Sequence, residues 1–428
     1  ECSMVWQDSD AENVTNKTVR EGVNLKRPPG LVGEVVDWIN SRSMFPRENL
    51  AVGAGLMAVS NAAGLRYRVE GTNTTINLMV FGIASSATGK ESVLQRLIDC
   101  HLSAGIGGAQ HGAIKSEQEI TRNILRNQAA IYTIDELGST LSKLSNASKR
   151  GGATYLEGVM SSLMSIFSKA NGTYPIGGDL KEEMRERIQK DVAREQKRLD
   201  EGNGSEDRLQ SALNELAQID DGIKDPFLSL YGITEPYTLS GAIDRGMMVS
   251  GFLGRSLVME EHDNVPKRKP LSTISYEELP DRLKMRLFSL YSGGFSVDKG
   301  DRVERKGDVV YIKLDPAASK ALDDVYDYWD KIATIEQDNG SGLEPVAMRS
   351  WETTIKIAGT LAVGTGLMTL EHVRYAHALV YRSAMWKLNK AKADDGAESF
   401  VDDATRGEGV LSAVKSVLDK TKPMTIGV

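Results

Sequence analysis

The chain has 428 residues, which is more than one compact domain usually holds, so two or three structural units are expected. Hydrophobic residues make up 40% of the chain and charged residues 26%, an ordinary globular composition that excludes wholesale disorder. The formal net charge of -7 excludes a protein with basic surface on all sides, but not a nucleic-acid motor whose positive charge lines only a channel.

Cysteine usage and hydropathy limit the compartment. The two cysteines, Cys2 and Cys100, provide no disulfide framework, which fits a reducing cytoplasm, that of the host cell if a phage encodes the protein. The most apolar stretch, Leu50 to Leu65, is too short to span a membrane and predicts a buried helix, so no membrane partner is expected. The chain begins at Glu1 without an initiator Met, which suggests a segment of a longer protein.

The first half of the chain predicts an α/β unit. Residues 1–30 are polar and end in two prolines and a glycine, as a linker or tail would, and residues 31–70 have helical periodicity. Residues 71–265 contain four short apolar runs rich in β-branched residues, at 74–83, 129–134, 227–233 and 255–259. Helical patterns separate these runs, so we expect a parallel sheet flanked by helices.

Charge and turn-forming residues predict three further segments. Residues from about 176 to 222 are dominated by charged side chains around a central Gly202-Asn203-Gly204-Ser205, which predicts two exposed helices inserted in the core, either as a solvated spacer or as a partner site. Residues 266–395 predict a mainly helical lid or collar domain, in which 308–314 is a strand and Asp315-Pro316 opens a helix. Residues 396–428 predict the start of a truncated C-terminal domain.

The strongest motif follows the first predicted strand. Its residues are Ala84, Ser85, Ser86, Ala87, Thr88, Gly89, Lys90, Glu91 and Ser92. A small-residue turn between a strand and a helix can direct backbone N–H groups at phosphates, and Lys90 would reach the β- and γ-phosphates. The match to GxxxxGK[ST] is imperfect because Ala84 replaces the first glycine and Glu91 stands where a metal-binding Ser or Thr is usual. The alternative is a Gly-Lys turn that opens an ordinary helix.

A second motif supports nucleotide binding. The strand at 129–134 ends in Asp135 and Glu136. A carboxylate pair at the carboxyl edge of a parallel sheet, beside a phosphate loop, is what metal-assisted phosphoryl transfer requires. We therefore expect ATP and Mg²⁺ as ligands, with Asp135 and either Glu91 or Ser92 near the metal and Glu136 polarising the attacking water.

Two more polar residues lie at predicted strand ends. Thr234 could sense the γ-phosphate or orient the water, or could simply belong to a strand-ending turn. Arg255, with Arg245 as a second choice, could complete the site of a neighbouring subunit and neutralise transition-state charge, or could form a structural salt bridge.

With these motifs in place, the chain resembles the helicase domains of phage and plasmid primase–helicase proteins, a branch of the P-loop ATPases close to the RecA and AAA+ types. The resemblance covers roughly residues 31 to 390. Beyond the motifs above, it is carried by segments 62–66, 77–80, 112–117, 165–168, 349–352 and 357–358. An acidic residue after the loop lysine is common in this branch, so Glu91 fits the family, whereas the missing first glycine departs from it.

The resemblance implies a homo-oligomeric ring, most simply a hexamer, that hydrolyses ATP between subunits and threads single-stranded DNA. Residues 144–152 would then form a flexible basic loop in the channel, where Lys149 and Arg150 meet phosphates, unless they are an ordinary surface loop. The helices after residue 300 would form the collar, with Arg349 as a further nucleotide-contact candidate.

Three functions remain open on the sequence alone. The first is an ATP-dependent DNA helicase or single-strand translocase of phage or plasmid replication. The second is a loader, packaging motor or double-strand translocase, which would carry the same ATPase motifs. The third is an ATP-binding scaffold with weak hydrolysis, in which the imperfect loop reflects lost activity.

Overall fold

A five-stranded parallel sheet forms the centre of the molecule. The computed structural model describes residues 20, 22–149, 154–242, 247, 251–261, 267–293 and 303–405. The sheet has the order β4-β5-β8-β3-β9. Its strands are β3 (Met79–Ile83), β4 (Gln110–His111), β5 (Ala129–Ile134), β8 (Phe227–Thr234) and β9 (Ser256–Glu260). The expected α/β class, with a mostly parallel sheet between helices, is confirmed.

Helices cover both faces of the sheet, which explains why β3, β5 and β8 are continuous apolar runs. The buried helix α3 (Glu48–Ala63) packs on one face, where Tyr231 Oη donates to Leu50 O at 3.0 Å. On the other face, Leu137 of α6 (Leu137–Lys149) lies against Gly232. The remaining helices around the sheet are α4 (Lys90–Ala104), α5 (Glu117–Arg126), α7 (Thr154–Ser168) and α10 (Pro236–Ala242).

The predicted single strand at 74–83 is wrong, because the segment divides into two strands of different sheets. Thr74–Thr75 forms β2 of a second sheet, with the order β11-β10-β1-β2, and Met79–Ile83 forms β3 of the central sheet. The other strands of the second sheet are β1 (Tyr67–Val69), β10 (Val310–Leu314) and β11 (Leu367–Met368). Between the two strands, the buried Asn77 amide donates to Phe167 O and Leu228 O. The chain passes from one sheet to the other at this residue.

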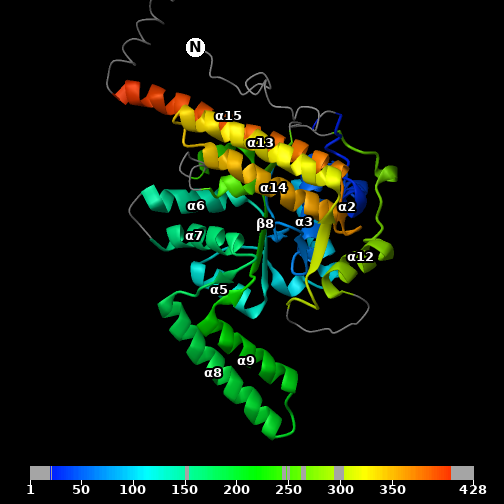
Figure 1. The fold of residues 1–428 in the computed structure, drawn as a ribbon, viewed down its shortest axis with the longest axis vertical. Coiled ribbons are helices and arrows are strands. Elements are labelled where there is room, and N and C mark those ends of the chain that lie inside the picture. Colours follow the sequence, from blue (N-terminus) through cyan, green and yellow to red (C-terminus); the bar gives the residue numbers. More distant parts are fainter. Residues whose placement is uncertain are drawn as a thin grey trace, which may run out of the picture.

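The C-terminal helices form a layer at one end of the molecule (Figure 1). They are α13 (Pro316–Asp338), α14 (Glu344–Ala362) and α15 (Leu370–Thr405), and α2 (Gly30–Ser41) contacts α14. The helix α12 (Asp281–Ser292) packs against α3 and α4. The Asp315 side chain caps α13 as predicted, accepting from Ala318 N. Ser383 Oγ of α15 accepts from Val258 N at 2.7 Å, so α15 satisfies part of the open edge of β9.

The charged insertion forms a helical hairpin that projects from the opposite end of the molecule in Figure 1. It consists of α8 (Gly178–Asp200) and α9 (Glu206–Asp221). At its root, β6 (Thr173–Tyr174) and β7 (Ile223–Lys224) pair antiparallel. Within the described residues, no helix has both the length and the apolar character needed to cross a membrane.

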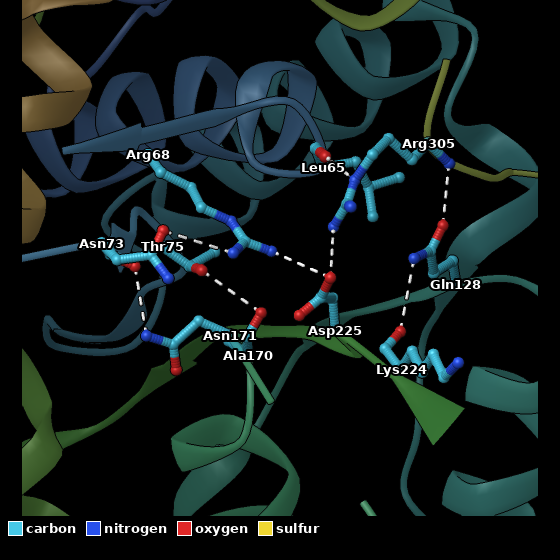
Figure 2. A network of polar contacts seen from close by, with 10 residues as sticks. All are labelled: Leu65, Arg68, Asn73, Thr75, Gln128, Ala170, Asn171, Lys224, Asp225 and Arg305. Carbon is cyan, nitrogen blue, oxygen red and sulfur yellow. Dashed lines mark hydrogen bonds and ion pairs between the residues drawn. The ribbon is translucent and has the colours of Figure 1, made fainter. Parts of the chain in front are cut away.

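A polar network fixes the hairpin root to the rest of the fold (Figure 2). The Asp225 carboxylate, which directly follows β7, is 3.0 Å from a guanidinium nitrogen of Arg68 and equally close to one of Arg305. Arg305 Nε also donates to Leu65 O, and its backbone N–H donates to Gln128 Oε1 just before β5. The network thus joins the second sheet, the start of the central sheet and the hairpin.

Candidate functional site

The segment between β3 and α4 forms a tight turn at the carboxyl edge of the central sheet. Ala84 N donates to Thr234 O at 3.0 Å, which extends the β3–β8 ladder by one residue. Ala87 and Gly89 then have φ of 57° and 88°, and the helix begins at Lys90. Ala84, which stands where the phosphate-loop pattern has its first glycine, does not have a positive φ. The turn therefore requires no glycine at that position. A turn that leads into a helix N-terminus is suited to binding an anion.

Residues upstream of α3 brace this loop. The buried Arg47 donates from Nε to Thr88 O at 2.7 Å, and Thr88 Oγ1 donates to Ser85 O at 2.6 Å. A side chain at Gly89 would approach Phe45 to 3.2 Å, so glycine is required there both by φ and by space. Arg47 and Phe45 were not predicted, because their contacts with the loop bring together residues about forty positions apart.

The loop lysine and the acidic pair meet at the same edge of the sheet. Lys90 Nζ lies 3.1 Å from Glu136 Oε1, and the Lys90 side chain is only 4% exposed. Asp135 Oδ1 accepts from Glu136 N at 2.9 Å, and Glu136 has a φ of 54°, which is uncommon for a residue other than glycine. Backbone strain of this kind concentrates at functional sites.

The strand β8 lies between the loop strand and the acidic strand, and its tip contributes two residues. Thr234 is fully buried, and its Oγ1 accepts from Gly138 N at 3.1 Å, so it links β8 to the turn that carries the acids. Glu235 Oε1 lies 3.6 Å from Lys90 Nζ. Glu235 was not predicted, although it follows a buried strand just as Asp135 and Glu136 do.

The predicted metal ligands are compatible with a nucleotide-bound magnesium ion. Glu91 and Ser92 lie in the first turn of α4, and Asp135 is exposed at the tip of β5. No group of three metal-ligating side chains occurs in the part of the chain that the structure describes. Mg²⁺ bound to substrate phosphates keeps several waters and needs only one or two protein carboxylates, so such an ion would not require a cluster of three side chains.

Arg255 lies at the opposite edge of the sheet from the loop. It precedes β9, whose first residue, Ser256, is aligned with Met79, the first residue of β3. Because a strand rises about 3.3 Å per residue, the five residues of β3 place Arg255 roughly 16 Å from the loop of its own chain. Arg255 Nε donates to Ser168 Oγ at 3.1 Å, and its Nη1 donates to Gly251 O at 3.0 Å. Arg255 can therefore complete a phosphate site only in a second copy of the chain.

Arg349 accompanies Arg255 at this edge. Its guanidinium packs over Gly251, where an added side chain would come within 1.7 Å of Nη1. Burial, followed by the positive charge of Arg255, lowers the pKa of Arg349. Lys387, whose pKa falls to about 7 through burial and then the charge of Arg349, donates to Ser256 O at 2.9 Å. This edge therefore carries two half-buried guanidinium groups, those of Arg255 and Arg349.

The predicted DNA-binding loop at 144–152 is wrong in its first part, because α6 continues to Lys149. The segment has no glycine or proline before Gly151, so nothing in it ends the helix earlier. The Lys149 side chain, Arg150 and Arg245 lie outside the described parts of the structure.

Searches with the chain found no matching protein-family model and no similar protein among those with curated descriptions.

Proposed function

We propose that the chain is an ATP-dependent DNA helicase or single-strand DNA translocase that acts in phage or plasmid DNA replication. The observation that carries the proposal is the meeting of Lys90 with Glu136, at 3.1 Å, where a strand-turn-helix loop and an acidic strand end share one edge of a parallel sheet. Such an arrangement is what a P-loop ATPase core needs for phosphoryl transfer by positioning and electrostatics.

Each residue then has a role in ATP hydrolysis. The backbone from Ser85 to Gly89, together with Lys90, binds the phosphates. Mg²⁺, when bound with the nucleotide, neutralises charge that develops on the phosphates; Asp135, with Glu91 or Ser92, would hold it. Glu136 polarises the attacking water, and Thr234 holds the turn that carries Glu136 through Gly138.

The position of Arg255 supports a ring. Because it lies at the edge opposite its own loop, hydrolysis that uses it requires a neighbouring copy, and a closed ring of identical copies gives every loop such a neighbour. We expect a hexamer, with single-stranded DNA in its channel and Lys149 and Arg150 as the proposed phosphate contacts.

The test is ATP turnover by the purified chain with and without single-stranded DNA, combined with unwinding of a forked duplex. Stimulated turnover with unwinding supports the helicase. Stimulated turnover without unwinding indicates a loader or another DNA motor. ATP binding without turnover indicates a scaffold, and absence of nucleotide binding overturns the proposal altogether.

A further inference from the structure

One lysine in the candidate site is shared by two carboxylates. Lys90 Nζ is 3.1 Å from Glu136 Oε1 and 3.6 Å from Glu235 Oε1. The two acids come from the tips of neighbouring strands, β5 and β8. Glu235 is the more enclosed of the two, with a side chain 30% exposed against 48% for Glu136.

Glu235 is held on a rigid part of the fold. The residue before it, Thr234, is fully buried and accepts from Gly138 N. The residue after it, Pro236, begins α10, and Leu239 N donates to Glu235 O at 3.0 Å. The backbone is thus fixed on both sides of Glu235, which keeps its carboxylate within reach of Lys90.

A carboxylate in this place opposes nucleotide binding. Lys90 is the residue that the phosphates need, so a bound triphosphate must compete with both Glu136 and Glu235 for one ammonium group. Glu235 also repels the phosphates directly, and such repulsion is strong where water is partly excluded. A divalent cation on the phosphates cancels two of their negative charges and attracts the same carboxylates.

We propose that Glu235 is a specificity-determining residue that restricts the site to metal-complexed nucleotide. The inference rests on the proposed ATPase function and deepens it, because it names the form of the substrate that the site accepts. Glu235 acts through Lys90 and through its own charge. When Mg²⁺-ATP takes Lys90, Glu136 is released to orient water, whereas metal-free ATP is rejected.

The experiment is isothermal titration calorimetry of the full chain with ATP in excess EDTA and with Mg²⁺-ATP. Glu235→Gln keeps the size of the side chain and removes its charge. We expect this variant to bind metal-free ATP about tenfold more tightly than the wild type, while affinity for Mg²⁺-ATP changes by less than about threefold. Glu235→Asp, which keeps the charge, should retain the wild-type preference, as should the matched control Glu278→Gln at a side chain that is 88% exposed.

The ratio of the two affinities decides the matter, because a merely structural defect would change both in the same direction. Equal changes in both affinities, or no change in either, would overturn the role of Glu235. A wild-type chain that binds Mg²⁺-ATP but not metal-free ATP, with no gain in Glu235→Gln, defeats the inference alone. A wild-type chain that binds neither form defeats the proposed function as well, so the two failures are distinguishable.

Discussion

Replacing Asp225 by Asn tests whether the network in Figure 2 holds the hairpin root in place. The substitution keeps the shape of the side chain but removes the charge that Arg68 and Arg305 share. Both guanidinium nitrogens lie 3.0 Å from the same Asp225 oxygen, so they are at most twice that distance apart and would then repel each other.

The size of the effect follows from burial. The side chains of Arg68, Asp225 and Arg305 are 10%, 24% and 23% exposed, so solvent screens this network only partly. Losing one charge-assisted hydrogen bond and one ion pair, each partly replaced by a neutral contact, and gaining the repulsion should cost about 2–4 kcal/mol of unfolding free energy. At an unfolding entropy of about 2.1 cal/mol/K per residue, this cost corresponds to a fall in Tm of roughly 2–4 °C for a chain of 428 residues.

The measurement is thermal unfolding by circular dichroism at 0.15 M salt. Asp220→Asn is the matched control: Asp220 is 55% exposed and pairs with Lys181 and Arg185 on the hairpin surface, so its loss should cost less than about 1 kcal/mol. Equal Tm values for the two variants would refute the claim that Asp225 anchors the hairpin.

The remaining predictions concern catalysis and pH. Glu136→Gln should retain ATP binding but lower phosphate release at least about 100-fold, since it removes the group that polarises water; full turnover would show that the wrong acid was chosen. Arg255→Ala should bind ATP yet be inactive, and it should poison wild-type assemblies. Mixing Arg255→Ala with the equally inactive Lys90→Ala should restore part of the ATPase activity. The control Arg282→Ala, at an exposed side chain, should keep full activity. Failure of both the poisoning and the restoration would exclude a shared site. Burial lowers the pKa of His101 to about 4. The stability that the neutral imidazole contributes is therefore complete above about pH 6.5 and should fall by up to about 1.4 kcal/mol per pH unit as the pH drops toward 4. Urea unfolding of His101→Gln should lack this slope.

The sequence predicted the elements that carry the site better than the contacts within it. β5 and β8 end within one residue of their predicted bounds, because buried parallel strands are apolar runs that stop at polar residues. The strand at 74–83 was predicted as one because periodicity does not reveal that the buried Asn77 bonds to two distant carbonyls. The order of the strands was also unknown, so the distance between Arg255 and its own loop could not be foreseen.

Arg47 and Glu235 show the same limit within the site. Arg47 supports the loop through Thr88 O, and Glu235 reaches Lys90 from a strand more than a hundred residues later in the chain. Glu235 follows a strand end, but no local pattern shows that it contacts Lys90 or that Arg47 contacts the loop, because each contact depends on how the sheet and α3 are assembled. Lys90 and Glu136 could be chosen from the sequence since each follows soon after the end of a predicted strand, and the structure brings the two side chains together.

The pairing of Tyr174 with Ile223 has an evolutionary consequence. The two ends of the inserted hairpin lie side by side, so nearly fifty residues are connected to the rest of the fold through one pair of short strands. Insertions and deletions beyond this pair of strands would leave the spacing of the main sheet unchanged, and natural selection could therefore change the hairpin while the carboxyl edge of the sheet stays the same. Related chains should differ most in length between residues 175 and 222.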